Sequence, residues 1–100
     1  MKSVFLQEAE EEFLEASRYY ESEAPGVGVA FIVEVHRAVR AIVTLPHAAP
    51  EVRGNIRKKV ISNFPYSILY AIEHDLIVIV IVAVAHHKRR PIYWHRRVRK

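Results

Sequence analysis

The sequence contains no cysteine, and only 3 of its 100 residues are glycine. Without cysteine, neither a disulfide framework nor a thiolate metal site can form, so packing has to stabilise the fold, as is usual in a reducing cytosol. The longest apolar run, residues 76–85, has about half of the roughly 20 residues that a membrane-spanning helix needs. The N-terminus also lacks the long apolar stretch of a signal peptide, because acidic residues soon follow its apolar patch. These absences indicate a cytoplasmic protein without a membrane partner.

Negative charge is missing from the C-terminal quarter of the chain. No carboxylate follows Asp75, whereas seven cations do: Lys88, Arg89, Arg90, Arg96, Arg97, Arg99 and Lys100. The net charge is +4 overall, but residues 1–50 carry −4 and residues 51–100 carry +8. A surface of this kind attracts phosphates or an acidic protein. With 51% hydrophobic residues the chain can form one domain with a modest core, which we expect to span residues 1–100.

Two segments place apolar residues at the spacing of an amphipathic helix. In residues 7–24 these are Ala9, Phe13, Ala16 and Tyr20, and in residues 27–45 they are Phe31, Val35, Ala38, Ile42 and Leu45. Pro25 and Gly26 separate the segments, and Pro46 ends the second because proline cannot donate the next backbone hydrogen bond. We therefore expect a hairpin of two antiparallel helices. The carboxylates predicted to face solvent on the first helix are Glu10, Glu11, Glu12 and Glu15.

The chain after residue 55 is rich in Ile, Val, Tyr and Phe, which favour strands. The predicted strands are residues 56–63, 66–73 and 76–85, with a loop at 47–55 before them. Hairpin turns are expected at Phe64–Pro65 and His74–Asp75. The last strand lacks alternation, so it should be buried on both faces and lie centrally in the sheet. With a short first strand near residues 4–6, the predicted class is α+β: first strand, helical hairpin, small antiparallel sheet of three strands, basic tail.

Four stretches of this sequence stand in a characteristic order. They are ASRYYES and PGVGVAF in the predicted helices, FPYSILY at the first hairpin, and LIVIVIVAVAHHKRRPIYW at the last strand and tail. Together they resemble the RelE/ParE superfamily of toxins from bacterial type II toxin-antitoxin modules, over nearly the whole chain. The resemblance implies a helical hairpin packed on an antiparallel sheet, a cytoplasmic toxin, and a cognate antitoxin that wraps around it in a hetero-oligomer. No cofactor and no metal are expected.

Toxins of this superfamily have two activities of different classes. ParE-like members bind DNA gyrase and block it, whereas RelE-like members are metal-independent endoribonucleases that cut messenger RNA on the ribosome. We expect a ParE-like gyrase inhibitor, of the kind that also stabilises plasmids, because the nuclease residues are incomplete here. The alternatives are a RelE-like nuclease and a decayed module that retains antitoxin binding only.

The nuclease group surrounds the scissile phosphate with basic side chains and a tyrosine. By resemblance, the catalytic residues of a nuclease here would be Lys58, His87, Arg89 and Tyr93. Val60 stands where a second basic residue of the first hairpin strand would be, and Ser67 replaces an arginine. Cleavage of RNA by its 2′-hydroxyl needs a base, an acid and cations against the phosphate. Histidine, which titrates near pH 6.5, and Tyr93 would have to supply the acid and the base.

A second set of residues is expected to contact the target or the antitoxin. These residues are Arg57, Lys59, Lys88, Arg89, Arg90, Tyr93, Arg96 and Arg97. Arginine pairs bidentately with carboxylates and phosphates, and lysine on an edge strand also discourages unwanted pairing. Trp94 is predicted to fold back into the core. His86 and His87 are neighbours in a strand and point to opposite faces, so they are not expected to chelate one ion.

Overall fold

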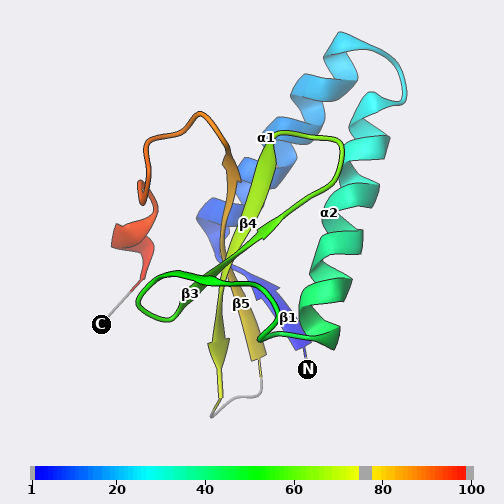
Figure 1. Cartoon of the computed structure of the whole chain (residues 1–100). Coiled ribbons are helices and arrows are strands. Elements are labelled where there is room, and N and C mark those ends of the chain that lie inside the picture. The colour runs from blue at the N-terminus through cyan, green and yellow to red at the C-terminus, as the bar shows by residue number, and fades with distance from the viewer. Residues whose placement is uncertain (1, 75–77, 99–100) are drawn as a thin grey trace.

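The computed structural model describes residues 2–74 and 78–98, within which five strands form one sheet (Figure 1). The elements are β1 (Lys2–Phe5), α1 (Gln7–Glu23), α2 (Val27–Thr44), β2 (Glu51–Arg53), β3 (Ile56–Val60), β4 (Tyr66–Glu73), β5 (Val78–His86) and the 3₁₀ helix η1 (His95–Arg97). The sheet order is β1-β5-β4-β3-β2, with β1 parallel to β5 and all other neighbours antiparallel. The predicted α+β class and its order of elements are confirmed.

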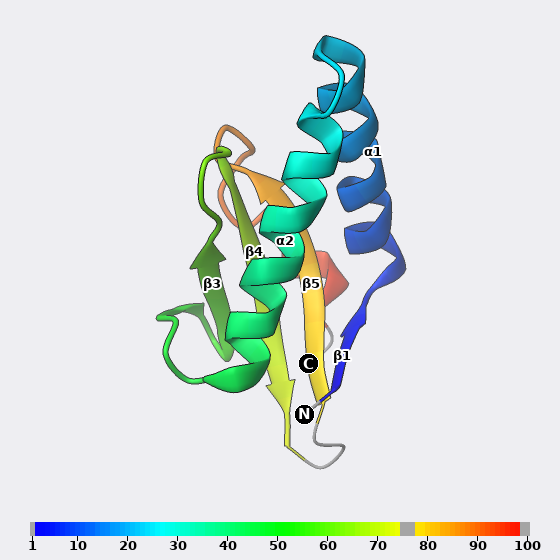
Figure 2. The same cartoon turned by 90° about the vertical axis from the view of Figure 1, so that its right-hand side faces the viewer.

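The two helices lie side by side on one face of the sheet (Figure 2). Most of their buried side chains are those that the helical spacing predicts, among them Ala9, Phe31 and Ile42, although Ser17 is buried as well. Phe13 and Tyr20 of the predicted stripe are only partly buried. The buried apolar side chains pack with buried residues of β4 and β5, and each large one contributes about 1.5–3 kcal/mol through burial. The last member of the predicted stripe differs, since Leu45 is 65% exposed. The reason is that α2 ends at Thr44, and Leu45 has left the helical conformation.

The turn between the helices depends on two glycines and one carboxylate. Gly26 has a φ of +88°, in the left-handed region that glycine adopts without steric cost. The Glu21 carboxylate accepts hydrogen bonds from the backbone N–H groups of Gly26 and Gly28, each at 3.0 Å. It thereby satisfies donors at the N-terminus of α2 that lack a partner within the helix. The helices also touch at Gly28, where a Cβ atom would come 2.6 Å from the Ser17 carbonyl oxygen.

The strands differ from the sequence prediction at their ends. β3 stops at Val60 rather than at residue 63, because residues 61–65 form the turn and Asn63 has a φ of 70°. β2 lies inside the predicted loop 47–55, and nothing in its three exposed residues signals a strand. The predicted turn at His74–Asp75 and the predicted start of the last strand at residue 76 lie, in whole or in part, outside the described residues.

The C-terminal segment, which we define as residues 87–98, covers the face of the sheet opposite to the helices (Figures 1 and 2). Trp94 is 4% exposed and packs with buried residues of β3, β4 and β5, as predicted. β5 lies between β1 and β4 with both faces covered, which confirms its predicted central position.

Among the described residues, no helix combines the length and apolar character needed to span a membrane.

Candidate functional site

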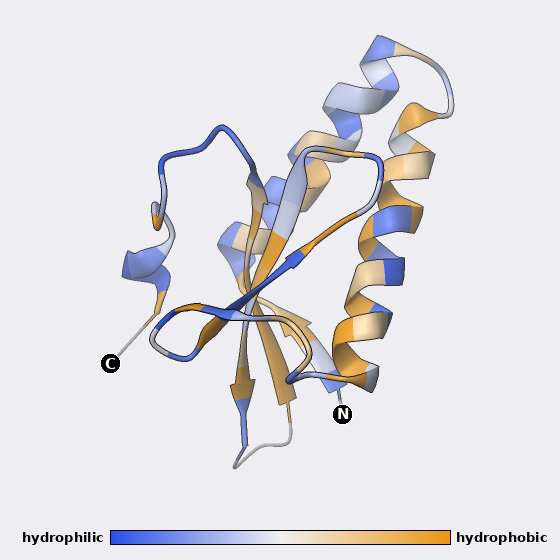
Figure 3. Ribbon diagram, in the orientation of Figure 1, coloured by the Kyte–Doolittle hydropathy of each residue, from blue (hydrophilic) through white to orange (hydrophobic). Residues whose placement is uncertain are grey.

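A pocket of about 310 Å³ opens where the C-terminal segment meets the sheet. Its polar lining residues are Lys58, Ser67, His86, His87, Arg89, Arg90 and Tyr93. The strand register explains why β3 and β4 contribute to it: Lys58 lies opposite Leu69, and Val60 lies opposite Ser67, so these side chains share the face that the C-terminal segment covers. Figure 3 shows the hydrophilic turn that follows the hydrophobic strand β5. The pocket therefore combines an apolar sheet with a basic rim.

All four residues of the nuclease alternative line this pocket. Lys58 comes from β3, whereas His87, Arg89 and Tyr93 come from the C-terminal segment. Ser67, which stands in place of an arginine, lies beside them, and its hydroxyl is 2.9 Å from Nε2 of His87. Because Ser67 is buried, this bond satisfies a hydroxyl that would otherwise be costly to bury.

A glutamate of α1 holds the C-terminal segment in place. The Glu12 carboxylate accepts a hydrogen bond from the Tyr93 hydroxyl at 2.6 Å and two from Arg97, at 2.9 Å from Nη1 and 2.8 Å from Nη2. Arg89 lies farther away, with Nη1 at 4.0 Å from Oε2. The side chains of Glu12 and Arg97 are only 14% and 16% exposed. The prediction that Glu12 faces solvent is therefore wrong, because its partners lie at the other end of the chain.

The same two side chains complete the edge of β5 beyond the end of β1. β1 pairs with β5 only as far as Phe5 and Ile81, after which Leu6 donates to the Ile81 carbonyl. Farther along β5, the Val84 N–H donates to Glu12 at 2.9 Å, and the Val82 carbonyl accepts from Arg97 at 3.2 Å. Strand-edge groups of this kind need partners when they are covered. Glu12 and Arg97 thus take the place of a missing strand.

The network changes the proton affinities of its members. Burial raises the pKa of the Tyr93 phenol and is the largest cause of its shift; the hydrogen bond to the Glu12 carboxylate raises the pKa further. The hydrogen bond to Glu12 likewise raises the pKa of the Arg97 guanidinium. Tyr93 is therefore held in its protonated form, in which it donates to Glu12. A phenol in this state is a poor donor to a leaving group in catalysis.

The adjacent histidines point in different directions. The His86 ring packs against Tyr66 at 5.0 Å between centroids, and its Nδ1 accepts from the Lys88 N–H at 3.0 Å. His87 instead reaches Ser67 in the pocket. β5 ends at His86, so the two histidines are not neighbours within a strand as predicted; both line the pocket, but their rings have different partners. Among residues 2–74 and 78–98, no group of three His, Asp or Glu side chains is placed to hold a metal ion.

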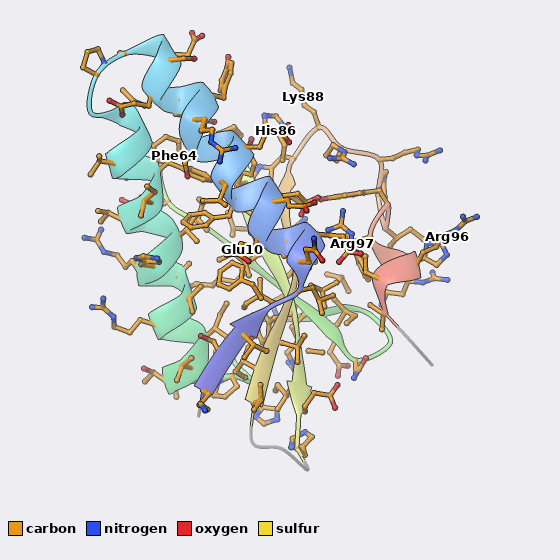
Figure 4. The ribbon with its side chains drawn as sticks, turned by 180° about the vertical axis from the view of Figure 1, so that it is seen from behind. Glu10, Phe64, His86, Lys88, Arg96 and Arg97 are labelled. Atoms are coloured by element: carbon orange, nitrogen blue, oxygen red, sulfur yellow. The ribbon has the colours of Figure 1, made fainter. Side chains whose placement is uncertain are left out.

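The basic residues predicted to bind a partner do not form one surface. Arg57 donates to the carbonyls of His47 at 3.1 Å and Ala49 at 2.6 Å, so it fixes the loop after α2. Lys59 lies opposite Ile68, on the helical face of the sheet. Figure 4 shows Arg97 on the side of the C-terminal segment turned toward α1, whereas Arg96 and Lys88 point away from the body of the protein. Arg89 and Arg90 line the pocket.

Comparison with protein-family models assigns the chain to a family. A family model described as "ParE toxin of type II toxin-antitoxin system, parDE" matches residues 4–91. The chain belongs to the ParE toxin family. A solved structure titled "Chromosomal ParDE TA system from P. aeruginosa" matches with a TM-score of 0.74 and 12% identity, over 86% of this chain and 95% of that chain. At this identity the likeness concerns the fold, and comparison with curated protein sequences gave no match.

The family match of this ParE toxin covers the helical hairpin and the sheet but stops within the C-terminal segment. Arg89 and Arg90 lie inside the matched region, whereas Tyr93, Trp94 and Arg97 follow it. Glu12 is inside the match, but its two closest side-chain partners are outside it. The family match therefore does not include Tyr93 and Arg97, whose contacts with Glu12 hold the C-terminal wall of the pocket in place.

Proposed function

We propose that this ParE toxin inhibits growth by binding DNA gyrase and that a cognate antitoxin neutralises it. Membership of the ParE toxin family supports this function. The hydrogen bonds of the pocket residues also support it, since a gyrase-binding toxin needs a surface and no acid-base chemistry of its own. The partner complex would be a hetero-oligomer of toxin and antitoxin, without a cofactor.

The observation that carries the proposal is that the acid and base of a nuclease are engaged inside the chain. The Tyr93 hydroxyl donates to Glu12, and a ring nitrogen of His87 is hydrogen-bonded to Ser67. Lys58 and Arg89 remain as cations at the pocket. Cations alone can attract a phosphate or a carboxylate, but cleavage of RNA also requires proton transfer. This arrangement favours binding over cleavage.

A supercoiling assay tests the proposal directly. Purified toxin added to gyrase and relaxed plasmid should prevent supercoiling or cause cleaved plasmid to accumulate. Addition of the protein encoded by the adjacent reading frame should reverse the effect if that protein is the antitoxin. Supercoiling that proceeds normally at toxin concentrations that stop growth would contradict the gyrase proposal. Absence of both gyrase inhibition and growth arrest would instead fit a decayed module.

The RelE-like nuclease remains a second candidate because one observation favours it. Lys58, His87, Arg89 and Tyr93, which the resemblance assigns to a nuclease, do line one pocket. Primer extension on messenger RNA from expressing cells separates the two candidates. Cuts at codon-spaced positions would favour the nuclease, whereas intact messenger RNA in arrested cells is the result that we expect.

A further inference from the structure

Three cations at the rim of the pocket have their charge available for a partner. Lys58 is exposed on β3, and the side chain of Arg89 is 53% exposed. Within the described residues, no ion pair involves Lys58 or Arg90, and the only carboxylate near Arg89 is Glu12, at 4.0 Å. Glu12 already binds Arg97 through both oxygens. The rim therefore attracts negative charge from outside the chain.

The tyrosine and the tryptophan of the pocket do not offer an open stacking surface to a nucleic-acid base. The Arg89 guanidinium lies 3.8 Å from the centre of the Tyr93 ring, and that of Arg97 lies 5.0 Å from it. Trp94 is buried beneath the segment. Proteins that bind single-stranded nucleic acid commonly add base stacking on exposed aromatic rings to their electrostatic attraction. Neither Tyr93 nor Trp94 therefore supplies that second element.

The floor of the pocket is instead apolar and small. Leu69, Ala85 and Ile92 line it together with Trp94, and Val52 of β2 stands at its edge. A volume of about 310 Å³ is at the lower end of the range of roughly 300 to 1,000 Å³ that ligand pockets occupy. It suits one or two side chains better than a whole helix. An apolar floor under a basic rim is complementary to an apolar side chain flanked by carboxylates.

We propose that this pocket binds an acidic peptide segment of a partner protein, with an apolar side chain on the floor and flanking carboxylates paired with Arg89, Arg90 and Lys58. The inference deepens the proposed function by naming the chemistry of the partner segment. The identity of the partner protein rests on the proposed function, whereas the chemistry of the bound segment is inferred from the pocket itself. The ion pair of Glu12 with Arg97 contributes to this site. Because Arg97 neutralises the Glu12 carboxylate, the cations at the rim of the pocket stay available to the carboxylates of the peptide.

The chain contains one tryptophan, and its place in the lining makes it a reporter of binding. The probe is a blocked peptide, acetyl-Glu-Glu-Leu-Glu-Glu-amide, which is itself non-fluorescent in the tryptophan range. Titration into the full chain should change the Trp94 emission and reach saturation. The matched peptide with glutamine in place of every glutamate should bind about tenfold more weakly or worse, because it cannot form charge-assisted pairs.

Variants then test the location of the site. Arg89→Gln with Arg90→Gln should weaken binding of the glutamate peptide about tenfold or more, and Lys58→Gln should weaken it by a smaller factor. The control is Arg18→Gln with Arg40→Gln, which removes the same charge from exposed positions on the helices. This control should bind within about twofold of the wild type. Far-UV circular dichroism checks that each variant is folded, and Lys58→Gln keeps the test informative if the double variant is not.

Several results would overturn the inference. Equal loss in the pocket variants and in the control would mean unspecific attraction to a basic protein. Tighter binding of a short oligouridylate than of the peptide would assign the pocket to nucleic acid, and tighter binding of inorganic phosphate would assign it to a free anion. No binding of the glutamate peptide would also refute it. The supercoiling assay is independent, so a toxin that binds the peptide without inhibiting gyrase would refute the proposed function and leave the pocket assignment supported.

Discussion

The Tyr93 hydroxyl donates a hydrogen bond of 2.6 Å to the Glu12 carboxylate, joining residues that are 81 positions apart. With Arg97 on the same carboxylate, this contact ties the C-terminal segment to the first helix. The segment in turn buries Trp94 against the sheet. One carboxylate therefore fixes both the packing of Trp94 against the sheet and the wall of the pocket, and changes at this carboxylate should affect the whole segment.

Glu12→Ala should lower the free energy of unfolding by about 3 kcal/mol. The substitution leaves Arg97, a largely buried cation, without its partner, and removal of one member of such a pair typically costs several kcal/mol. The neighbouring Glu11→Ala is the control, because Glu11 is exposed and, within residues 2–74 and 78–98, its side chain accepts a hydrogen bond from Gln7 alone. It should cost less than about 0.5 kcal/mol. Urea denaturation measures the unfolding free energy of both variants. Similar losses in the two would mean that the contacts of Glu12 with Arg97 and Tyr93 do not stabilise the fold.

Tyr93→Phe should destabilise the protein by about 1 to 2 kcal/mol while growth inhibition persists. The variant keeps the ring on which Arg89 stacks but removes the hydroxyl that donates to Glu12. A catalytic tyrosine would behave differently, since its loss would abolish toxicity in a protein of nearly normal stability. Growth curves after induction, together with a thermal melt of the purified variant, distinguish the two outcomes.

The stability of the protein should fall above about pH 10, and part of this fall should depend on Tyr93. Its pKa is raised in the folded state above the ordinary 10.0, so the folded chain keeps the phenol proton where the unfolded chain has lost it. The contribution of Tyr93 is thus complete below pH 10 and is lost as the pH rises toward the folded pKa. Between pH 10 and 11 the slope for wild type should exceed that of Tyr93→Phe by up to about 1.4 kcal/mol per pH unit. Identical slopes would show that the phenol is not held in its protonated form.

Gly28→Ala should destabilise the helical hairpin, although alanine is the better helix former by about 1 kcal/mol. The new Cβ would lie 2.6 Å from the Ser17 carbonyl oxygen and 2.8 Å from Cβ of Glu21, so the helices would have to move apart. We expect a loss of about 1 to 3 kcal/mol in unfolding free energy. Gly54→Ala is the comparison. A Cβ atom at this position would meet no other atom within 4 Å, but alanine at a φ of +57° costs about 1 to 2 kcal/mol because of backbone strain. A stabilised Gly28→Ala would disprove the close packing of the helices.

Local sequence patterns predict most of this fold because most of its elements follow from neighbours along the chain. The helical stripes and the aromatic content of β4 are examples, since period and composition are visible in a short window. β2 has no such signal: three exposed residues pair with β3 through an irregular register. Its existence depends on the hairpin around Gly54 rather than on its own side chains.

The candidate site was harder to predict because its decisive contacts are distant in sequence. Glu12 lies three residues after Ala9 and four before Ala16, so it borders the buried stripe of α1, but only the contacts with Arg97 and Tyr93 explain why a carboxylate is buried there. The bond between Ser67 and His87 likewise depends on how β4 and β5 align, which includes a bulge near Leu69. A sequence signal exists in retrospect: the chain after Asp75 has no carboxylate, so a buried arginine there must find one elsewhere.

Arg89→Ala with Arg90→Ala should abolish growth inhibition and shift the melting temperature by less than about 5 °C. Both side chains line the pocket, and the contact of Arg89 with the Tyr93 ring is worth only about 0.5 to 1 kcal/mol at a half-exposed position. The charge-matched variant Arg18→Ala with Arg40→Ala should remain toxic, because those residues lie on the helices, away from the pocket. Induced growth and calorimetry provide the two readouts. A fall of more than about 10 °C in the pocket variant would assign Arg89 and Arg90 to the scaffold, whereas undiminished toxicity at normal stability would place the proposed gyrase contact elsewhere on the protein.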